Sequence, residues 1–225
     1  MNFEKYNENL SYSYSFGAFG TIELLKQKSS FCLAVIIDPS FIKNEAYKKI
    51  EELCQKSKIE IIVNHQLIEK IRDKDNIFVI GVFKKYHSTL DNDRHIIIYD
   101  IDDYGLIGTI IRSMNGFNYH NLALINCNVD VFNKHLIRAS MGAFFALNIQ
   151  SFDSIETYHQ TYQNKQIINI SNIGKKAEKY SNDCDITYAF SNKAIDNSLV
   201  SNVLFDKDLS LDNIVNIVLF SLYHR

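Results

Sequence analysis

The spacing of apolar residues along this chain alternates between strand-like runs and helix-like stripes. In the first ninety residues, apolar runs at 33–37, 59–63 and 77–83 predict three buried strands. Between them, a helix is predicted after Asn44, whose side chain is suited to cap it, and a shorter helix is predicted from His65 to Arg72. The alternation of strands and helices with short connections predicts a small α/β sandwich with a mainly parallel sheet.

A polar, turn-rich segment at 84–94 is the best linker candidate, and the pattern restarts after it. Strands are predicted at 95–100, 122–126, 143–149, 166–170, 186–190 and 203–205. Helices are predicted at 105–117, 132–141, 154–162 and 211–223. These alternating units predict a doubly wound α/β sheet, and the linker divides the chain into a domain at 1–90 and a domain at 91–225.

Two glycine-containing stretches of the second half stand out. In the first, Gly105 and Gly108 lie between a predicted strand and a predicted helix, which indicates a tight turn with Arg112 on the first turns of the helix. In the second, Arg138 stands among small residues that allow one backbone to approach another closely: Ala139, Ser140, Gly142 and Ala143.

Composition and charge limit the classes of function. The 225 residues are 46% hydrophobic and 22% charged, as in ordinary globular proteins. The formal net charge is −2, and residues 1–90 carry 13 basic and 11 acidic side chains, a local excess of +2. A general basic field for nucleic acid is therefore excluded, and any affinity for RNA must come from local patches.

The four cysteines are far apart and form no C-x-x-C pair, which predicts reduced thiols and a cytoplasmic protein. A zinc site that combines them with His65 or His120 is an alternative that the spacing does not support, so no metal is predicted. No apolar run is long enough to span a membrane, and the N-terminus lacks the layout of a secretory signal.

The glycine-containing stretches and their spacing resemble the SPOUT superfamily, in its SpoU/TrmH branch of RNA 2′-O-ribose methyltransferases. The resemblance implies an α/β protein with two parts. Residues 1–90 are similar to an L30e-like domain that binds the RNA substrate, and residues 91–225 are similar to a domain tied in a trefoil knot. It further implies a cytoplasmic homodimer that joins through the knot and the C-terminal helix, and that acts on tRNA or rRNA.

The resemblance makes Arg112 the catalytic residue that activates the ribose 2′-hydroxyl. Methyl transfer from this weakly acidic hydroxyl needs an acceptor or a cation that stabilises the developing alkoxide. Leu106 stands where the family has an asparagine. A structural reading of Arg112 is also open, in which it pairs with Asp100 or Asp103 on the helix surface.

The resemblance also implies binding of S-adenosylmethionine by the segments after two late strands. The predicted cofactor-binding residues are Ala189, Ser191, Asn192, Val203, Phe205 and Leu211. The family pattern Phe-Gly-Asn-Glu reads here as Phe190, Ser191, Asn192 and Lys193. We expect a side chain at 191 to intrude on the volume of the adenosine, and the lysine to place the wrong charge near a sulfonium.

The final motif of the family is only partly present. Asn213 is predicted as its catalytic asparagine, although a second register places Asp212 there. Lys84, Lys85 and Arg138 are predicted to contact RNA, with a solvated face as the alternative for each lysine. Two functions follow: an S-adenosylmethionine-dependent RNA 2′-O-methyltransferase, or an RNA-binding SPOUT homologue that has lost cofactor binding and methyl transfer.

Overall fold

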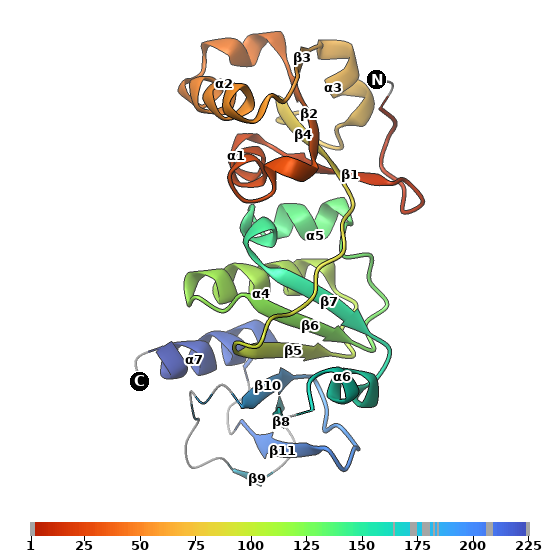
Figure 1. The fold of residues 1–225 in the computed structure, drawn as a ribbon, viewed down its shortest axis with the longest axis vertical. Helices are drawn as coiled ribbons and strands as arrows, with labels where there is room; N and C mark the ends of the chain where they lie inside the picture. Colours follow the sequence, from red (N-terminus) through yellow and green to blue (C-terminus); the bar gives the residue numbers. More distant parts are fainter. Residues whose placement is uncertain are drawn as a thin grey trace. The chain divides into compact units, whose positions relative to one another are not determined.

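The computed structural model describes residues 3–163, 165–171, 175–176, 181, 183, 185–205 and 209–223. The chain forms two compact units, coloured along the sequence in Figure 1. The first consists of Met1–Tyr86 with Asp130–Ala146, and the second of His87–Val129 with Leu147–Arg225. Residues 130–146, which the sequence assigns to the second domain, thus belong to the first unit, and the division into domains 1–90 and 91–225 stays a prediction.

The first unit contains a four-stranded sheet in the order β1-β4-β2-β3. Its strands are β1 (Tyr12–Phe16), β2 (Cys32–Ile37), β3 (Ile61–Val63) and β4 (Val79–Lys84). Its α-helices are α1 (Ala18–Gln27), α2 (Glu45–Ser57), α3 (His65–Ile71) and α5 (Lys134–Ala139). Only β2 and β3 run parallel, whereas β4 is antiparallel to both β1 and β2. The prediction of a mainly parallel sheet is therefore wrong here, because β4 returns against β2 and the unpredicted β1 adds a further antiparallel edge.

The two faces of this sheet are covered by different helices. On one face, Ala34 and Ile36 of β2 pack with Ile68 and Ile71 of α3. On the other face, the alternate β2 residues Val35 and Ile37 pack with side chains of α1 and α2, among them Leu25, Ile50 and Cys54. The strict alternation of β2 side chains thus builds a three-layer unit from a short strand.

The second unit contains a seven-stranded sheet in the order β7-β6-β5-β10-β8-β11-β9, in which every pairing is parallel. Its strands are β5 (His95–Tyr99), β6 (Asn121–Ile125), β7 (Asn148–Phe152), β8 (Gln166–Ser171), β9 (Lys175–Lys176), β10 (Ile186–Phe190) and β11 (Val200–Leu204). Its helices are α4 (Tyr104–Gly116), α6 (Ile155–Thr161) and α7 (Leu211–Tyr223). The predicted parallel α/β sheet is confirmed.

The strand predicted at 143–149 is wrong in its position. Residues Ala143–Ala146 form a 3₁₀ turn in the first unit, and β7 begins only at Asn148. The apolar run that suggested a strand reflects burial in an aromatic cluster. Phe144 contacts the rings of Phe132 and Phe145, and both Phe144 and Phe145 are buried.

The core of the second unit again has two sides. Ile97, Ala123 and Ala189 pack with Ile155 and Tyr158 of α6. The alternate strand positions, such as Ile96 and Ile98, are also fully buried and face the opposite side. Helices α4 and α7 pack against each other. No helix among the described residues is long and apolar enough to cross a membrane.

Candidate active site

The carboxyl ends of the parallel strands in the second unit lie along one edge of the sheet. Ile98 of β5 pairs with Phe190 of β10, and Phe190 pairs with Ile170 of β8. On the far side of β8, Leu204 of β11 pairs with Ser171. Open α/β sheets bind ligands at this edge, so the segments that follow these strands form the candidate active site.

The turn after β5 differs from the predicted one. Gly105 and Gly108 lie within α4, and the residue in the left-handed region is Asp100, with φ of 57°. Asp103 caps the helix by accepting a hydrogen bond from the Leu106 N–H at 2.8 Å. The prediction that the glycines make the turn is therefore wrong, because an aspartate tolerates the left-handed conformation that the turn requires.

Lys193 and Asp100 form an ion pair between the segments that follow the neighbouring strands β10 and β5. The Lys193 side chain is 60% exposed and that of Asp100 is 34% exposed. Asn126, which follows β6, donates a hydrogen bond from Nδ2 to Asp100 Oδ1 at 3.0 Å. The Asp100 carboxylate raises the pKa of the Lys193 ammonium above its ordinary value. The charge of this lysine is thus balanced by a carboxylate.

The segment 191–195 is held from inside by a buried polar network. The Ser191 hydroxyl, 3.0 Å from Asn169 Oδ1, also contacts the Lys193 carbonyl. The Asn169 amide donates to the same carbonyl at 3.1 Å and to Asn202 Oδ1 at 2.9 Å. Asn202 Oδ1 also accepts from the Ile195 N–H at 2.8 Å. Because Ser191 and Asn169 are buried, the Ser191 side chain points into the protein. This differs from the orientation expected from the sequence, in which the side chain intrudes on the volume of the adenosine.

The other predicted cofactor residues have different environments. Ala189 packs in the core on the side of α6. Asn192 is exposed, and Val203 and Phe205 at the end of β11 are half-buried. Leu211 is buried as the first residue of α7. The Phe205 N–H donates to the Ser171 carbonyl at 2.9 Å. Asn192, Val203 and Phe205 border the same sheet edge, while residues 206–208 lie outside the described part of the chain.

Arg112 is an exposed residue of α4. Asp103 caps the helix and Asp100 pairs with Lys193, so the structural pairing considered for Arg112 is not made. Within the described residues, its guanidinium has neither a hydrogen bond nor an ion pair. An exposed guanidinium that has no partner among the described residues keeps its N–H donors available to a ligand.

Asn213 lies in the first turn of α7, where its Nδ2 donates to Ser210 Oγ at 2.8 Å. The side chain is exposed, and Asp212 beside it is half-buried. Asn213 and Asp212, the two alternatives for the final motif, thus both lie in the first turn of α7.

A hollow that the sequence analysis did not identify lies at the ends of β6 and β7. It has a volume of about 340 Å³. Its lining is mostly polar and consists of Asn126, Cys127, Asn128, Ser151, Phe152 and Asp153. Burial raises the pKa of the Cys127 thiol, so this cysteine stays protonated. The run of polar residues directly after the predicted strand at 122–126 was the available signal.

The three residues predicted to contact RNA lie in the first unit. Lys84 is exposed at the end of β4. The Lys85 ammonium donates to the Glu8 carbonyl at 2.7 Å, lies 3.5 Å from Asp130 Oδ2, and lies 5.3 Å from the centre of the Tyr6 ring. Because Lys85 is satisfied by these groups, Lys84 is the more accessible of the two lysines.

Arg138 makes an ion pair with Asp73, in which Nη1 lies 3.1 Å from each carboxylate oxygen. Lys134 Nζ lies 3.5 Å from the same carboxylate, so two cations share one anion. The guanidinium side chain remains 32% exposed. Contact of Arg138, Lys84 and Lys85 with RNA stays a prediction.

The close backbone approach predicted at the small residues is confirmed at Gly142. This residue has a φ of +85°, and a methyl group in place of its hydrogen would lie 2.9 Å from Glu23 Cβ and 3.4 Å from Gly20 Cα. Its partner is α1, a helix of the same unit. The requirement for glycine therefore comes from packing against α1 and from the left-handed backbone.

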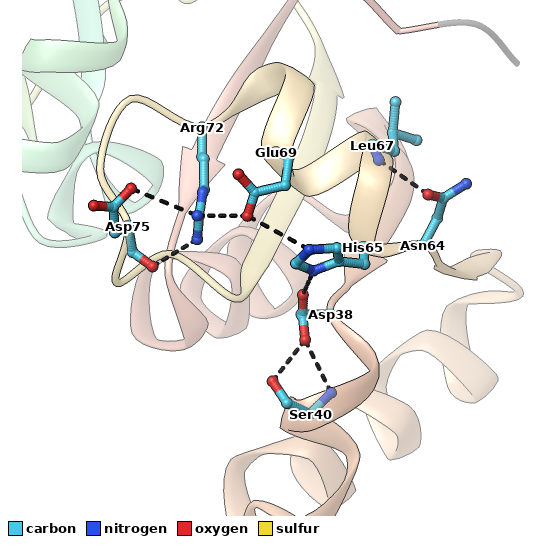
Figure 2. Close-up of polar contacts among 8 residues, drawn as sticks. All are labelled: Asp38, Ser40, Asn64, His65, Leu67, Glu69, Arg72 and Asp75. Carbon is cyan, nitrogen blue, oxygen red and sulfur yellow. Dashed lines mark hydrogen bonds and ion pairs between the residues drawn. The ribbon is translucent and has the colours of Figure 1, made fainter.

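Figure 2 shows a polar cluster around His65 and Asp38. The sequence analysis considered only one of its members, His65, and only as a possible zinc ligand. Asp38 accepts hydrogen bonds from the Ser40 N–H at 2.9 Å and hydroxyl at 2.6 Å, and from His65 Nδ1 at 2.6 Å. His65 also lies 3.8 Å from Glu69, which pairs with Arg72. These bonds lower the pKa of Asp38 to about 2. Because the aspartate lies between serine and histidine, the cluster lacks the serine–histidine contact of a nucleophilic triad and instead ties α3 to the end of β2.

Metal ligands do not gather in the described part of the chain: no three His, Cys, Asp or Glu side chains there are placed to hold an ion. Cys32, Cys54 and Cys127 are free thiols, and Cys184 lies outside the described residues.

Comparison with known proteins relates this chain to RNA methyltransferases. Residues 93–195 match the model of the SpoU rRNA methylase family. No curated protein matches the sequence.

Solved structures share the fold over nearly the whole chain. An rRNA methyltransferase from Sinorhizobium meliloti is 17% identical, with a TM-score of 0.69 over 95% of this chain and 87% of that one. The SpoU methyltransferase AviRb from Streptomyces viridochromogenes, in complex with AdoMet, is 14% identical, with a TM-score of 0.71 over 95% and 90%. An RNA 2′-O ribose methyltransferase is 11% identical, with a TM-score of 0.72 over 95% and 88%.

Proposed function

We propose that this chain, whose residues 93–195 match the SpoU rRNA methylase family, methylates a ribose 2′-hydroxyl of tRNA or rRNA with S-adenosylmethionine. The observation that carries the proposal is Arg112, which is exposed in the family segment and has no internal partner within the described residues. A solved relative binds AdoMet on the same fold, which supports the choice of cofactor.

The residues at the sheet edge fit S-adenosylmethionine despite their departures from the family pattern. The Ser191 side chain is turned inward to Asn169, so it leaves the space outside the loop free. Lys193 is paired with Asp100, so its positive charge is neutralised beside the place proposed for a sulfonium. Val203 and Phe205 offer half-buried apolar surface for an adenine, and Asn192, Leu211 and the backbone of the segment 191–193 complete the proposed site.

When bound, S-adenosylmethionine supplies an electrophilic methyl group. The Arg112 guanidinium has N–H donors and no acceptor, so its role is electrostatic: it stabilises the negative charge that develops on the ribose oxygen. Asn213, whose carboxamide oxygen has no hydrogen-bond partner within the part of the chain that the structure describes, is the proposed second polar group for the ribose.

We further propose that the first unit is an L30e-like module that binds RNA. Its small sheet covered by helices on both faces supports this assignment. For the second unit we propose a trefoil knot, supported by the position of the late strand β10 between β5 and β8. A crystal structure in which the chain after β10 passes outside every earlier loop would overturn the knot.

We propose a homodimer that joins through the knot and α7. Three apolar residues spaced by three positions are exposed on this helix: Ile217 by 42%, Phe220 by 54% and Tyr223 by 50%. Phe117 at the end of α4 contacts two of them, with ring centres 6.5 Å from Phe220 and 5.9 Å from Tyr223. A contiguous apolar strip of this kind is suited to a copy of itself across a two-fold axis. In analytical ultracentrifugation we expect a dimer, and a monomer for Phe220→Lys.

Isothermal titration calorimetry with S-adenosylmethionine tests the proposed function directly. We expect saturable binding that Val203→Trp weakens, because the indole would fill the apolar surface at the end of β11. Ser201→Trp, at an exposed position of the same strand, is the matched control and is expected to bind normally. Tritium transfer from the cofactor to bulk tRNA or rRNA, followed by digestion to nucleosides, should yield 2′-O-methylnucleosides.

Absence of heat at millimolar cofactor from the folded protein would overturn the proposal. RNA binding without cofactor binding would then favour the non-methylating RNA-binding homologue. Methylation at a base atom instead of the ribose would keep the enzyme but reject the 2′-hydroxyl as its target.

A further inference from the structure

The first unit contains a hollow that none of the proposed catalytic groups uses. It has a volume of about 250 Å³ and lies between the β1–α1 turn and the end of α5. We call it the α1 pocket, and its lining residues are Ser15, Phe16, Gly17, Ala18, Phe19, Gly20, Ile137, Arg138, Met141 and Gly142. Its volume is below the 300–1,000 Å³ or so of typical ligand pockets, which suits a single nucleotide unit rather than a larger ligand.

The N-terminus of α1 opens on this pocket without a cap. Gly17 at the N-cap position has φ of 86° and provides no side chain, and the first turn of this ten-residue helix contains no acidic residue. The first intrahelical bond runs from Thr21 N–H to the Gly17 carbonyl, so the N–H groups of Ala18 and Phe19 precede it. Free N–H groups at the positive end of a helix dipole attract anions.

A buried hydroxyl in the wall of the same pocket is independent evidence for a ligand. Ser15 is 1% exposed, and its Oγ has no hydrogen-bond partner among the described residues. This oxygen lies against Gly20, where an added methyl group would be only 2.7 Å from it. A buried hydroxyl without a partner costs free energy, which a ligand in the pocket would recover.

The charge and the shape of the pocket complement a nucleotide. Arg138 and Lys134 together neutralise Asp73 and leave an excess of one positive charge. Glu23, beyond Gly142, is already paired with Lys26 at 2.7 Å. At the mouth, Phe19 is 59% exposed and Met141 is 52% exposed, although both are large and apolar. Unpaired RNA bases stack on aromatic side chains such as Phe19, Met141 adds apolar contact, and cations hold the phosphates.

We propose that the α1 pocket binds one unpaired nucleotide of the RNA substrate, with its phosphate between the α1 N-terminus and Arg138 and its base against Phe19 and Met141. The inference rests on the proposed function and specifies where the first unit holds the RNA.

Fluorescence anisotropy with a labelled ten-nucleotide oligouridine tests the pocket in the full-length protein. Phe19→Ser removes an exposed ring, so the fold should survive; binding should weaken on the order of tenfold with an unchanged salt dependence. Arg138→Met should weaken binding and lower the slope of log affinity against log salt by about 0.7, the value for one phosphate of a single strand. Matched controls in the same unit are Ile42→Ser and Lys48→Met, both at exposed positions.

Ser15→Ala separates binding from folding. Loss of an unpartnered buried hydroxyl should leave the thermal midpoint unchanged or raise it, yet weaken RNA binding severalfold. Photocrosslinking with 5-bromouridine in the same oligonucleotide should label a peptide that contains Phe19 or Met141.

Wild-type affinity in both Phe19→Ser and Ser15→Ala would overturn the α1 pocket while the proposed function stands, because RNA is then bound elsewhere. Crosslinks confined to other peptides would do the same. Failure of the wild-type protein to bind any RNA would overturn the pocket and the proposed function together, and cofactor calorimetry would then show whether the methyltransferase site itself is intact.

Discussion

The ammonium of Lys193 is paired with the carboxylate of Asp100 across the ends of two neighbouring parallel strands. Judged from the sequence, a lysine at this position opposes binding of a cationic cofactor. The structure gives it a partner that cancels its charge and joins the segment after β10 to the turn after β5. A departure from the family pattern can therefore be compensated by a residue almost a hundred positions away.

Removal of the Asp100 carboxylate should weaken cofactor binding by leaving the Lys193 ammonium uncompensated beside the place proposed for the sulfonium. In Asp100→Asn, which keeps a residue that tolerates the positive φ of position 100, the loss of affinity for S-adenosylmethionine should be larger at low salt because the repulsion is then less screened. The double variant Asp100→Asn/Lys193→Met should recover affinity, since it removes the uncompensated ammonium as well. Calorimetry at two salt concentrations measures both effects; equal affinities in the single and double variants would contradict the pairing.

Removal of the Arg112 cation should abolish most methyl transfer while cofactor binding is preserved. We expect Arg112→Met to lower turnover by about 10²–10³-fold, the usual effect of losing one group that stabilises developing charge. Asn115→Met, at an exposed position of the same helix, should retain activity. Single-turnover tritium transfer provides the measurement. A loss confined to KM for RNA would make Arg112 an RNA-binding residue instead.

Truncation of Asn169 should destabilise the second unit. The change Asn169→Ala removes the partner of the Ser191 hydroxyl and of two further groups, with an expected cost of about 1–3 kcal/mol. Asn192 is exposed and follows Ser191 in the sequence, so Asn192→Ala should change the free energy of unfolding by less than about 0.5 kcal/mol. Urea unfolding followed by circular dichroism compares the two; similar midpoints would show that the network contributes little.

Alanine at Gly142 should destabilise the first unit. The left-handed φ and the approach to Glu23 together predict a loss of at least about 1 kcal/mol. Gly116 has open space around it at the end of α4, so Gly116→Ala should be neutral or stabilising by up to about 1 kcal/mol. Thermal unfolding of the two variants under identical conditions is sufficient. A neutral Gly142→Ala would show that the segment after α5 can shift.

Stability should fall in acid through Asp38. Its folded pKa of about 2 lies below the ordinary value of 3.8, so its contribution is complete above about pH 4 and is lost as the pH falls toward 2. We expect Asp38→Asn to cost about 1–2 kcal/mol at pH 6 and much less at pH 2.5. Urea midpoints at the two pH values give the comparison, and a cost that does not vary with pH would exclude the ionised form as the stabilising one.

Much of the second unit could be predicted because its strands are buried on both faces and read as continuous apolar runs, as at 95–100 and 186–190. The same signal misled at Ala143–Ala146, where aromatic residues are buried as a turn of the first unit. Strand β1 escaped prediction because its serines, Ser13 and Ser15, alternate with aromatic residues yet are buried themselves.

In the candidate site, too, some features could be predicted from the sequence and others depend on the tertiary structure. The sequence alone predicted Arg112 as the residue that carries the chemistry, and it determined the need for a small residue at Gly142, because local spacing and the absence of a Cβ are properties of the chain itself. Only the tertiary structure decided that Ser191 turns inward, that Lys193 meets Asp100, and that Ser15, whose hydroxyl has no hydrogen-bond partner among the described residues, lines the same pocket as Arg138. Each of these depends on which distant segments the fold brings within a few ångströms, and burial and pairing at such distances determine what a side chain is free to do.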